Sequence, residues 1–280
     1  MADVAANGLT FAVRSAGPAD GRPVILLHGF PQNSRCFARQ LHALGQAGYR
    51  AFAPDQRGYS ARARPEAVGE YRIADLVSDV TALADSLGVG SFDLVGHDWG
   101  ALVAWYVAGS CPDRVRSLTS VSTPHPSALT ATLIGGDSDQ VQRLGYVDLF
   151  RQPEVPEQIL LGADGSGAGL RRVFTDSGVD DEAVDSYVEV LRQPGALTAA
   201  LNWYRANGFG HLVETGPITM PTMYVWSTDD VALGRAAAES TADYVQGPYR
   251  FEVLEDVNHW IPDVAHDRLN GLLLDHLATA

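Results

Sequence analysis

The chain has 280 residues, 46% of them apolar, so it is long enough to bury a large core in one or two domains. Its formal net charge is −14, and all 20 of its basic residues are arginines. The acidic excess argues against nucleic acid as a partner, because a phosphate backbone would be repelled. The absence of lysine excludes Schiff-base chemistry and the lysine of a nucleotide-binding loop.

The N-terminus and the apolar runs give no sign of a secretory or membrane segment. The first residues lack a basic stretch followed by an apolar one, and no apolar run approaches the ~20 residues of a membrane span. The two cysteines, Cys36 and Cys111, lack the spacing of metal ligands. We therefore expect a cytoplasmic protein with no membrane insertion and with neither a metal nor an organic cofactor. The sequence does not specify an oligomeric state.

Short apolar runs alternate with helical patterns in the first part of the chain. The runs lie at residues 23–27, 49–54, 92–95 and 117–121, and their length and composition are typical of buried parallel strands. Between the second and third runs, apolar residues from Ile73 to Leu87 recur on one face of a helix, which predicts a crossover helix. Two further strand-like runs follow late in the chain, at residues 222–226 and 251–254.

The middle third of the chain has a different pattern. From residue 124 to residue 216 no comparable β-run occurs, and several helix-like stretches are separated by Pro and Gly. The sequence therefore predicts an α/β core formed by residues 1–123 and 217–280, with a helical lid, or cap, inserted at residues 124–216. Lids of this kind usually shape the pocket beneath them.

The main chemical signal is the segment Gly96-His97-Asp98-Trp99-Gly100, which lies between a predicted strand and a helix. Small residues two places before and after a central residue are typical of a nucleophile elbow, because strand and helix approach closely there. Asp98 stands at the nucleophile position. The spacing alone is a weak signal, since a helix cap or a tight loop also produces it.

The order of later residues supports this interpretation. In α/β-hydrolases the nucleophile is followed by an acid and then by a histidine, and this chain offers Asp98, Asp230 and His259. Each of them follows a predicted strand, and open α/β sheets place their ligands at the carboxyl ends of parallel strands. A solvated turn residue is the alternative interpretation of Asp230, and its neighbour Asp229 competes for the same role.

The segment His28-Gly29-Phe30-Pro31 follows the first predicted strand. We expect the backbone N–H groups of Phe30 and Trp99 to form an oxyanion hole, because the glycine permits a close approach and the proline stiffens the turn. An ordinary Gly-Pro turn is the alternative. His28 and Pro31 flank this site and are candidate substrate-binding residues. Five histidines have no motif around them and are expected to be structural or solvated: His42, His125, His211, His266 and His276.

An aspartate nucleophile restricts the substrate. A carboxylate is ionised near neutral pH and attacks well only where a carbon bears a good leaving group, which indicates the sp³ carbon of an epoxide or of a carbon–halogen bond. The product is an ester on Asp98, which His259, oriented by Asp230, can cleave by deprotonating water. An epoxide, unlike a halide, needs a proton donor for its leaving alkoxide. The predicted lid offers Tyr146 and Tyr204, although lid tyrosines often only pack.

Across nearly its whole length the sequence resembles the soluble epoxide hydrolase family. The matching segments are HGFP at 28–31, DQRGYS at 55–60, GHDWG at 96–100, LNWYR at 201–205, VWSTDD at 225–230 and NHW at 258–260. The resemblance implies the α/β-hydrolase fold, with an eight-stranded, mostly parallel sheet, flanking helices and an inserted helical lid. It also implies hydrolysis of a small-molecule epoxide by water to a vicinal diol. Within it, Tyr204 and Tyr146 activate the epoxide oxygen, Asp230 is the acid, and Trp203 is a candidate substrate-binding residue.

Two dehalogenase families share the fold and the aspartate nucleophile, and they are the main alternatives. Haloalkane dehalogenases usually have Asn where Phe30 stands, which supplies a halide donor. Fluoroacetate dehalogenases follow the nucleophile with Arg and place another Arg three residues further on, whereas this chain has Trp99 and Leu102. Both departures favour an epoxide over a haloalkane or haloacid. A non-catalytic ligand-binding member of the fold is a third alternative.

Overall fold

The computed structural model describes residues 1–208 and 214–280, and these contain one eight-stranded sheet in the order β1-β2-β4-β3-β5-β6-β7-β8. Strands β3 to β8 pair in parallel, whereas β1 and β2 pair antiparallel at one edge. The strands span Ala2–Ala6 (β1), Leu9–Ala16 (β2), Pro23–Leu27 (β3), Arg50–Pro54 (β4), Phe92–His97 (β5), Val115–Val121 (β6), Thr222–Asp229 (β7) and Tyr249–Asn258 (β8). The mostly parallel α/β sheet predicted from the sequence is confirmed.

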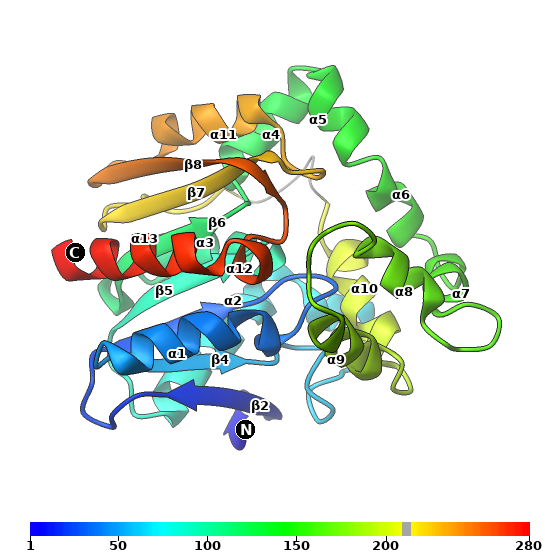
Figure 1. Ribbon diagram of the computed structural model, residues 1–280, viewed down its shortest axis with the longest axis horizontal. Helices are drawn as coiled ribbons and strands as arrows, with labels where there is room; N and C mark the ends of the chain where they lie inside the picture. The colour runs from blue at the N-terminus through cyan, green and yellow to red at the C-terminus, as the bar shows by residue number, and fades with distance from the viewer. Residues whose placement is uncertain (209–213) are drawn as a thin grey trace.

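Helices cover both faces of the sheet. Helices α1 and α13 pack together on the face toward the viewer in Figure 1, and α2 and α3 pack together behind it. The helices of the core span Ala38–Gln46 (α1), Ile73–Ser86 (α2), Trp99–Ser110 (α3), Arg235–Ser240 (α11), Ile261–Val264 (α12) and His266–Thr279 (α13). Short 3₁₀ helices lie at Ser34–Phe37 (η1), Val68–Tyr71 (η2), Pro112–Arg114 (η3) and Thr241–Tyr244 (η5).

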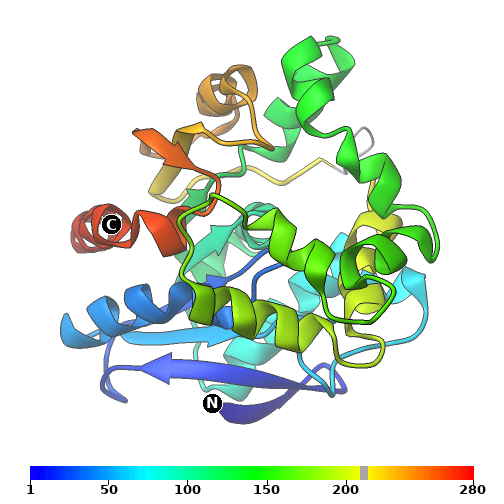
Figure 2. The same ribbon diagram turned by 45° about the vertical axis from the view of Figure 1, so that its right-hand side comes forward.

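The described residues between β6 and β7 contain helices and no strand of the sheet, as the sequence pattern predicts. Helix α4 packs against α11 beside the sheet, while α6 to α10 lie together beyond the carboxyl ends of the parallel strands (Figures 1 and 2). The helices span Pro126–Ile134 (α4), Ser138–Arg143 (α5), Tyr146–Phe150 (α6), Val155–Leu161 (α7), Ala168–Val173 (α8), Asp181–Leu191 (α9) and Ala196–Ala206 (α10). The boundaries of a separate lid at residues 124 and 216 remain a prediction.

Helix α3 lies at the centre of the molecule. It packs against β3, β5 and β6 of the sheet and against the neighbouring helix α2. Each of its residues from Trp99 to Ala108 is buried, which agrees with a helix that is apolar on all sides. Among the described residues no helix combines the length and apolar character that a membrane span requires.

The turn between β5 and α3 depends on two glycines. A Cβ atom on Gly96 would lie 2.4 Å from the carbonyl oxygen of Gly100, and a Cβ atom on Gly100 would lie 2.0 Å from the carbonyl oxygen of Leu27. Side chains cannot occupy these positions unless the backbone moves. The close approach holds Asp98, the residue between them, at the carboxyl end of the sheet.

We expect Gly100→Ala to destabilise the protein and the matched variant Gly271→Ala to stabilise it. Both glycines are helical, but a Cβ atom on Gly271 meets no other atom within 4 Å. Overpacking at Gly100 should cost roughly 1–3 kcal/mol of unfolding free energy, whereas alanine at Gly271 should add about 0.5–1 kcal/mol through helix propensity. Urea unfolding of both variants measures the difference, and equal effects would contradict the steric account.

Candidate active site

Asp98 occupies a strained turn directly after β5. Its backbone has φ 55° and ψ −122°, a conformation that costs a non-glycine residue energy and persists only where the surroundings enforce it. The backbone N–H of Phe30 donates to Asp98 Oδ1 at 2.8 Å, and the backbone N–H of Trp99 also hydrogen-bonds the carboxylate. A Cβ atom on Gly29 would lie 2.1 Å from that same Oδ1, so glycine is needed for the carboxylate to reach the Phe30 amide.

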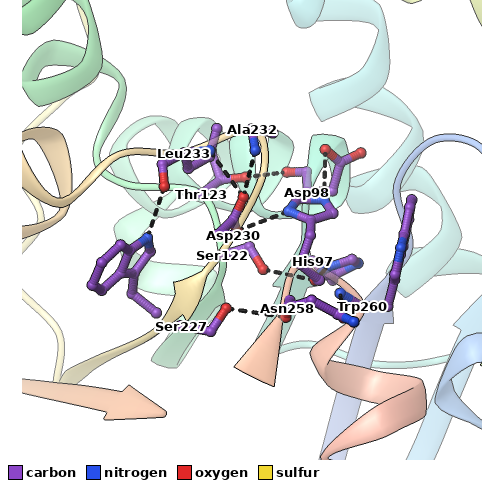
Figure 3. Close-up of polar contacts among 12 residues, drawn as sticks. His97, Asp98, Ser122, Thr123, Ser227, Asp230, Ala232, Leu233, Asn258 and Trp260 are labelled. Atoms are coloured by element: carbon purple, nitrogen blue, oxygen red, sulfur yellow. Dashed lines mark hydrogen bonds and ion pairs between the residues drawn. The ribbon is translucent and has the colours of Figure 1, made fainter. Parts of the chain in front are cut away.

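Asp230 and His259 come from the loops after β7 and β8. The Asp230 Oδ2 atom lies 2.8 Å from His259 Nδ1, and the Asp230 side chain is fully buried. Its other oxygen, Oδ1, accepts hydrogen bonds from the backbone N–H groups of Ala232 at 2.8 Å and Leu233 at 2.9 Å (Figure 3). The neighbouring Asp229 is exposed. The structure therefore brings Asp230, and not Asp229, to the histidine.

His259 lies between the two carboxylates. Its Nε2 atom is 3.4 Å from Asp98 Oδ2, the carboxylate oxygen that does not contact the Phe30 amide. The ring of His97 donates from Nε2 to the His259 carbonyl oxygen at 2.8 Å, and the Ser122 hydroxyl donates to the same oxygen at 3.2 Å. The backbone of the histidine is thus fixed from the β5 and β6 sides.

The charges of Asp230 and Asp98 shift the pKa of His259, and His259 shifts the pKa of Asp98. Burial alone would disfavour the imidazolium, but the carboxylates of Asp230 and Asp98 outweigh it and raise the pKa of His259 to about 10. Burial would raise the pKa of Asp98, yet hydrogen bonding and charge from His259 hold that pKa below its ordinary value. Burial, with a smaller effect of His259, lowers the pKa of His97 to about 4, so His97 is neutral. At pH 7 the site holds two carboxylates and one imidazolium.

A cavity of about 230 Å³ opens above Asp98. Both predicted tyrosines line it, Tyr146 at the start of α6 and Tyr204 on α10, with their ring centroids 6.3 Å apart. Burial raises the pKa of each phenol, so both are neutral hydrogen-bond donors at pH 7. The other residues around this cavity are Phe30, Pro31, Phe150, Val173, Val231, Ala232, His259 and Trp260.

Two predicted substrate-binding residues lie outside this lining. The indole of Trp203 donates to the Arg57 carbonyl oxygen at 2.9 Å and packs edge-on against Trp99. Trp203 therefore contacts the residue that follows the nucleophile. His28 is fully buried beside Asp98, where its Nε2 atom accepts the Gln56 backbone N–H at 3.0 Å. The polar atoms of Trp203 and His28 are thus engaged by the protein, and the assignment of both as substrate-binding residues remains a prediction. Pro31 does line the cavity, and His211 lies outside the described residues.

Gln140 on α5 is a site residue that the sequence pattern did not indicate. Its amide is fully buried, donates to the Ala232 carbonyl oxygen at 2.9 Å and accepts the Gly234 backbone N–H at 2.9 Å. Arg143, one turn further on, donates to the Asp230 carbonyl oxygen. Helix α5 therefore holds the loop whose amides bind Asp230. A glutamine in a short polar helix carries no sequence signal for this contact, because its partners are about ninety residues away.

The sequence analysis also did not identify a cluster of hydrogen-bonded side chains around Asp263 on α12. Both of its carboxylate oxygens accept from the Tyr187 hydroxyl on α9, at 3.0 and 2.9 Å, and one also accepts from Gln32 Nε2 at 2.7 Å. Gln32 follows Pro31, and Asp263 lies four residues after His259. Burial raises the pKa of Asp263 to about 6, against the opposing effect of these hydrogen bonds. The cluster joins helix α9 to the Phe30 loop and to the His259 loop.

We expect Gln140→Leu to loosen Asp230 and so to lower the pKa of His259. The variant leaves the Gly234 N–H and the Ala232 carbonyl oxygen without their partner, which should cost about 1–3 kcal/mol of unfolding free energy per group. NMR titration of His259 measures the pKa. Gln142→Leu on the exposed face of the same helix is the matched control. An unchanged His259 pKa in Gln140→Leu would show that Gln140 does not position the acid.

The raised pKa of His259 also predicts a pH dependence of stability. A histidine whose folded pKa of about 10 exceeds its unfolded value of roughly 6.5 stabilises the fold fully below pH 6.5, and this contribution is lost as the pH rises toward 10. The unfolding free energy of the wild type should therefore fall between pH 7 and pH 9.5, measured by urea unfolding. His259→Gln should lack most of this fall. An equal fall in both proteins would refute the assigned charge state.

Comparisons with known proteins agree with this geometry. The sequence profile of the alpha/beta hydrolase fold family matches residues 22–265. The AB hydrolase superfamily protein YfhM of Bacillus subtilis is 35% identical over 97% of this chain and 95% of its own length. Epoxide hydrolase 4 of Mus musculus is 31% identical, over 95% of this chain and 76% of its own length.

Solved structures extend the similarity to three dimensions. One from a study of epoxide hydrolases in metagenomes from hot environments superposes with a TM-score of 0.87 at 30% identity, covering 99% of this chain and 97% of the other. The chain belongs to the epoxide hydrolase family of the α/β-hydrolase fold.

Proposed function

We propose that the chain is an epoxide hydrolase that converts a small-molecule epoxide and water to a vicinal diol through an ester on Asp98. The observation that carries this proposal is that two phenols, Tyr146 and Tyr204, line the same cavity as Asp98 and His259. An epoxide needs a nucleophile on one side and a proton donor for its alkoxide on the other. Relatives named as epoxide hydrolases support the same activity.

The first step is attack by Asp98 on an epoxide carbon. The Oδ2 atom is the nucleophile, because Oδ1 is held by the backbone amides of Phe30 and Trp99. The C–O bond of the ring breaks as the new ester bond forms, and a phenol of Tyr204 or Tyr146 donates its proton to the ring oxygen. No metal is required, since the nucleophile is already ionised and the donors are already neutral.

Ester formation changes the proton affinity of His259. The ester has no charge, so one of the two carboxylates that raise the pKa of His259 disappears. The imidazolium then releases its proton, which restores the phenol. The charges balance, because an imidazolium and a carboxylate become a neutral imidazole and a neutral ester. His259 enters the second step as a base, which it is not in the free enzyme.

The second step is hydrolysis of the ester. Neutral His259, oriented by Asp230, takes a proton from a water molecule that attacks the Asp98 carbonyl carbon. Negative charge develops on Oδ1, where the Phe30 and Trp99 amides stabilise it. The leaving alkoxide takes the proton of the resulting carboxylic acid and departs as the diol. This restores the pair of Asp98 carboxylate and His259 imidazolium.

The same lining argues against the dehalogenase alternatives. A haloacid carries a carboxylate that needs a cationic partner, and the described residues around the cavity include no arginine. A haloalkane needs only weak halide donors, which leaves the two converging phenols without a role. We also propose that the helices between residues 124 and 216 act as the lid, because they supply both phenols.

A single-turnover reaction with an aryl epoxide in ¹⁸O-labelled water tests this mechanism. The diol of the first turnover should be unlabelled, because its new oxygen comes from Asp98, and the label should appear on Asp98 by mass spectrometry. His259→Gln should accumulate an adduct of one epoxide on Asp98.

The matched control is His42→Gln, at an exposed histidine on α1, which should turn over like the wild type. Label that enters the diol in the first turnover, with no adduct in His259→Gln, would mean direct attack by water and would refute the ester mechanism. Absence of turnover with every epoxide would refute the proposed activity itself.

A further inference from the structure

Two cavities of very different volume meet at Asp98 and Tyr146. The larger, of about 230 Å³, and the smaller, of about 20 Å³, share these two residues and no other described one. Because Asp98 lines both cavities, the two ends of an epoxide that reacts with it can occupy the large cavity and the small one. The two cavity volumes limit the size of the substituents that each of the two epoxide carbons can carry.

The large cavity fits a bulky apolar group. An apolar cavity of about 150 Å³ holds a benzene ring, so about 230 Å³ accommodates an aryl ring with a short extension. Aromatic rings of Phe30, Phe150 and Trp260 line it, and Val173 and Val231, which are 36% and 68% exposed, form an apolar mouth. Apart from Asp98 and His259, the described lining residues are uncharged, so an ionised substituent would lose its hydration without gaining a partner.

The small cavity has room for only a very small substituent. A volume of about 20 Å³ corresponds to roughly one water molecule by the same measure. Leucines close it on several sides, and Leu129 and Leu144 are both buried. These side chains belong to the packed interior, where overpacking displaces neighbours at a cost in free energy. A hydrogen atom or a methyl group fits there, and an aryl ring does not.

From this asymmetry we infer that the substrates are neutral terminal epoxides that carry one aryl or comparably bulky apolar group. Epoxides with a bulky group on each ring carbon are excluded by the leucines of the small cavity. The inference rests on the proposed epoxide hydrolase function, and it names the class of substrate that this particular site takes.

A graded series of substrates tests the inference. Styrene oxide, trans-β-methylstyrene oxide and trans-stilbene oxide place hydrogen, methyl and phenyl in turn on the second ring carbon. We expect kcat/KM for trans-stilbene oxide to be lower than for styrene oxide by about 100-fold or more, with the methyl compound nearer to styrene oxide. Leu144→Ala should narrow the ratio between styrene oxide and trans-stilbene oxide by about 10-fold or more.

Leu160→Ala is the matched control, because Leu160 is a buried leucine of helix α7 that lines neither cavity. It should leave the substrate ratio unchanged. If Leu144→Ala does not fold, Leu129→Val enlarges the same cavity by less, and the wild-type ratio remains a test by itself. Comparable kcat/KM values for styrene oxide and trans-stilbene oxide would overturn the inference while leaving the proposed function intact. No hydrolysis of any of the three, nor of the small 1,2-epoxybutane, would overturn both.

Discussion

The chemistry of this protein depends on one strained turn, in which Asp98 is held at φ 55° between β5 and α3. Such a backbone conformation costs a non-glycine residue about 1–3 kcal/mol, and the surrounding structure must supply it. Burial of α3 against three strands and α2 does so, since the helix cannot relax without exposing its apolar residues. Gly29, Gly96 and Gly100 make the close approaches possible. The nucleophile is therefore positioned by the core of the fold.

A buried excess of negative charge is the second constraint, because two carboxylates accompany one imidazolium. Backbone amides compensate for it: Phe30 and Trp99 donate to Asp98, and Ala232 and Leu233 donate to Asp230. Amides fixed in the backbone do not need to reorganise when charge moves during the reaction. Apart from His259, the described residues that line the cavity include no cationic side chain.

The sequence predicted those features that follow from local pattern and chain order. Buried strands, the turn at Asp98 and the order of Asp98, Asp230 and His259 are of this kind. The hairpin of β1 and β2 was not identified, although Asn7-Gly8 is a typical hairpin turn, because β1 is short and most residues of both strands are only partly buried or exposed. The partners of Gln140 and Asp263, the orientation of Trp203 and the two cavity volumes depend on packing between segments far apart in the chain, which periodicity does not encode.

Three of the helices over the sheet do more than cover the site, because each is attached to a different loop of the core. Helix α5 holds the Asp230 loop through Gln140, α9 holds the His259 loop through Tyr187 and Asp263, and α10 is tied to the Arg57 loop through Trp203. A hydrogen bond between neutral groups contributes about 0.5–1.5 kcal/mol and one to a charged group about 1.5–3 kcal/mol. The Gln140 and Trp203 attachments are buried and neutral, and the Tyr187–Asp263 attachment is partly buried. A rigid swing of these helices away from the sheet would break them together and would disturb the geometry of Asp230 and His259. The exposed side chains of Val173 and Val231 lie in the lining of the large cavity, so this part of the lining reaches the surface without such a movement.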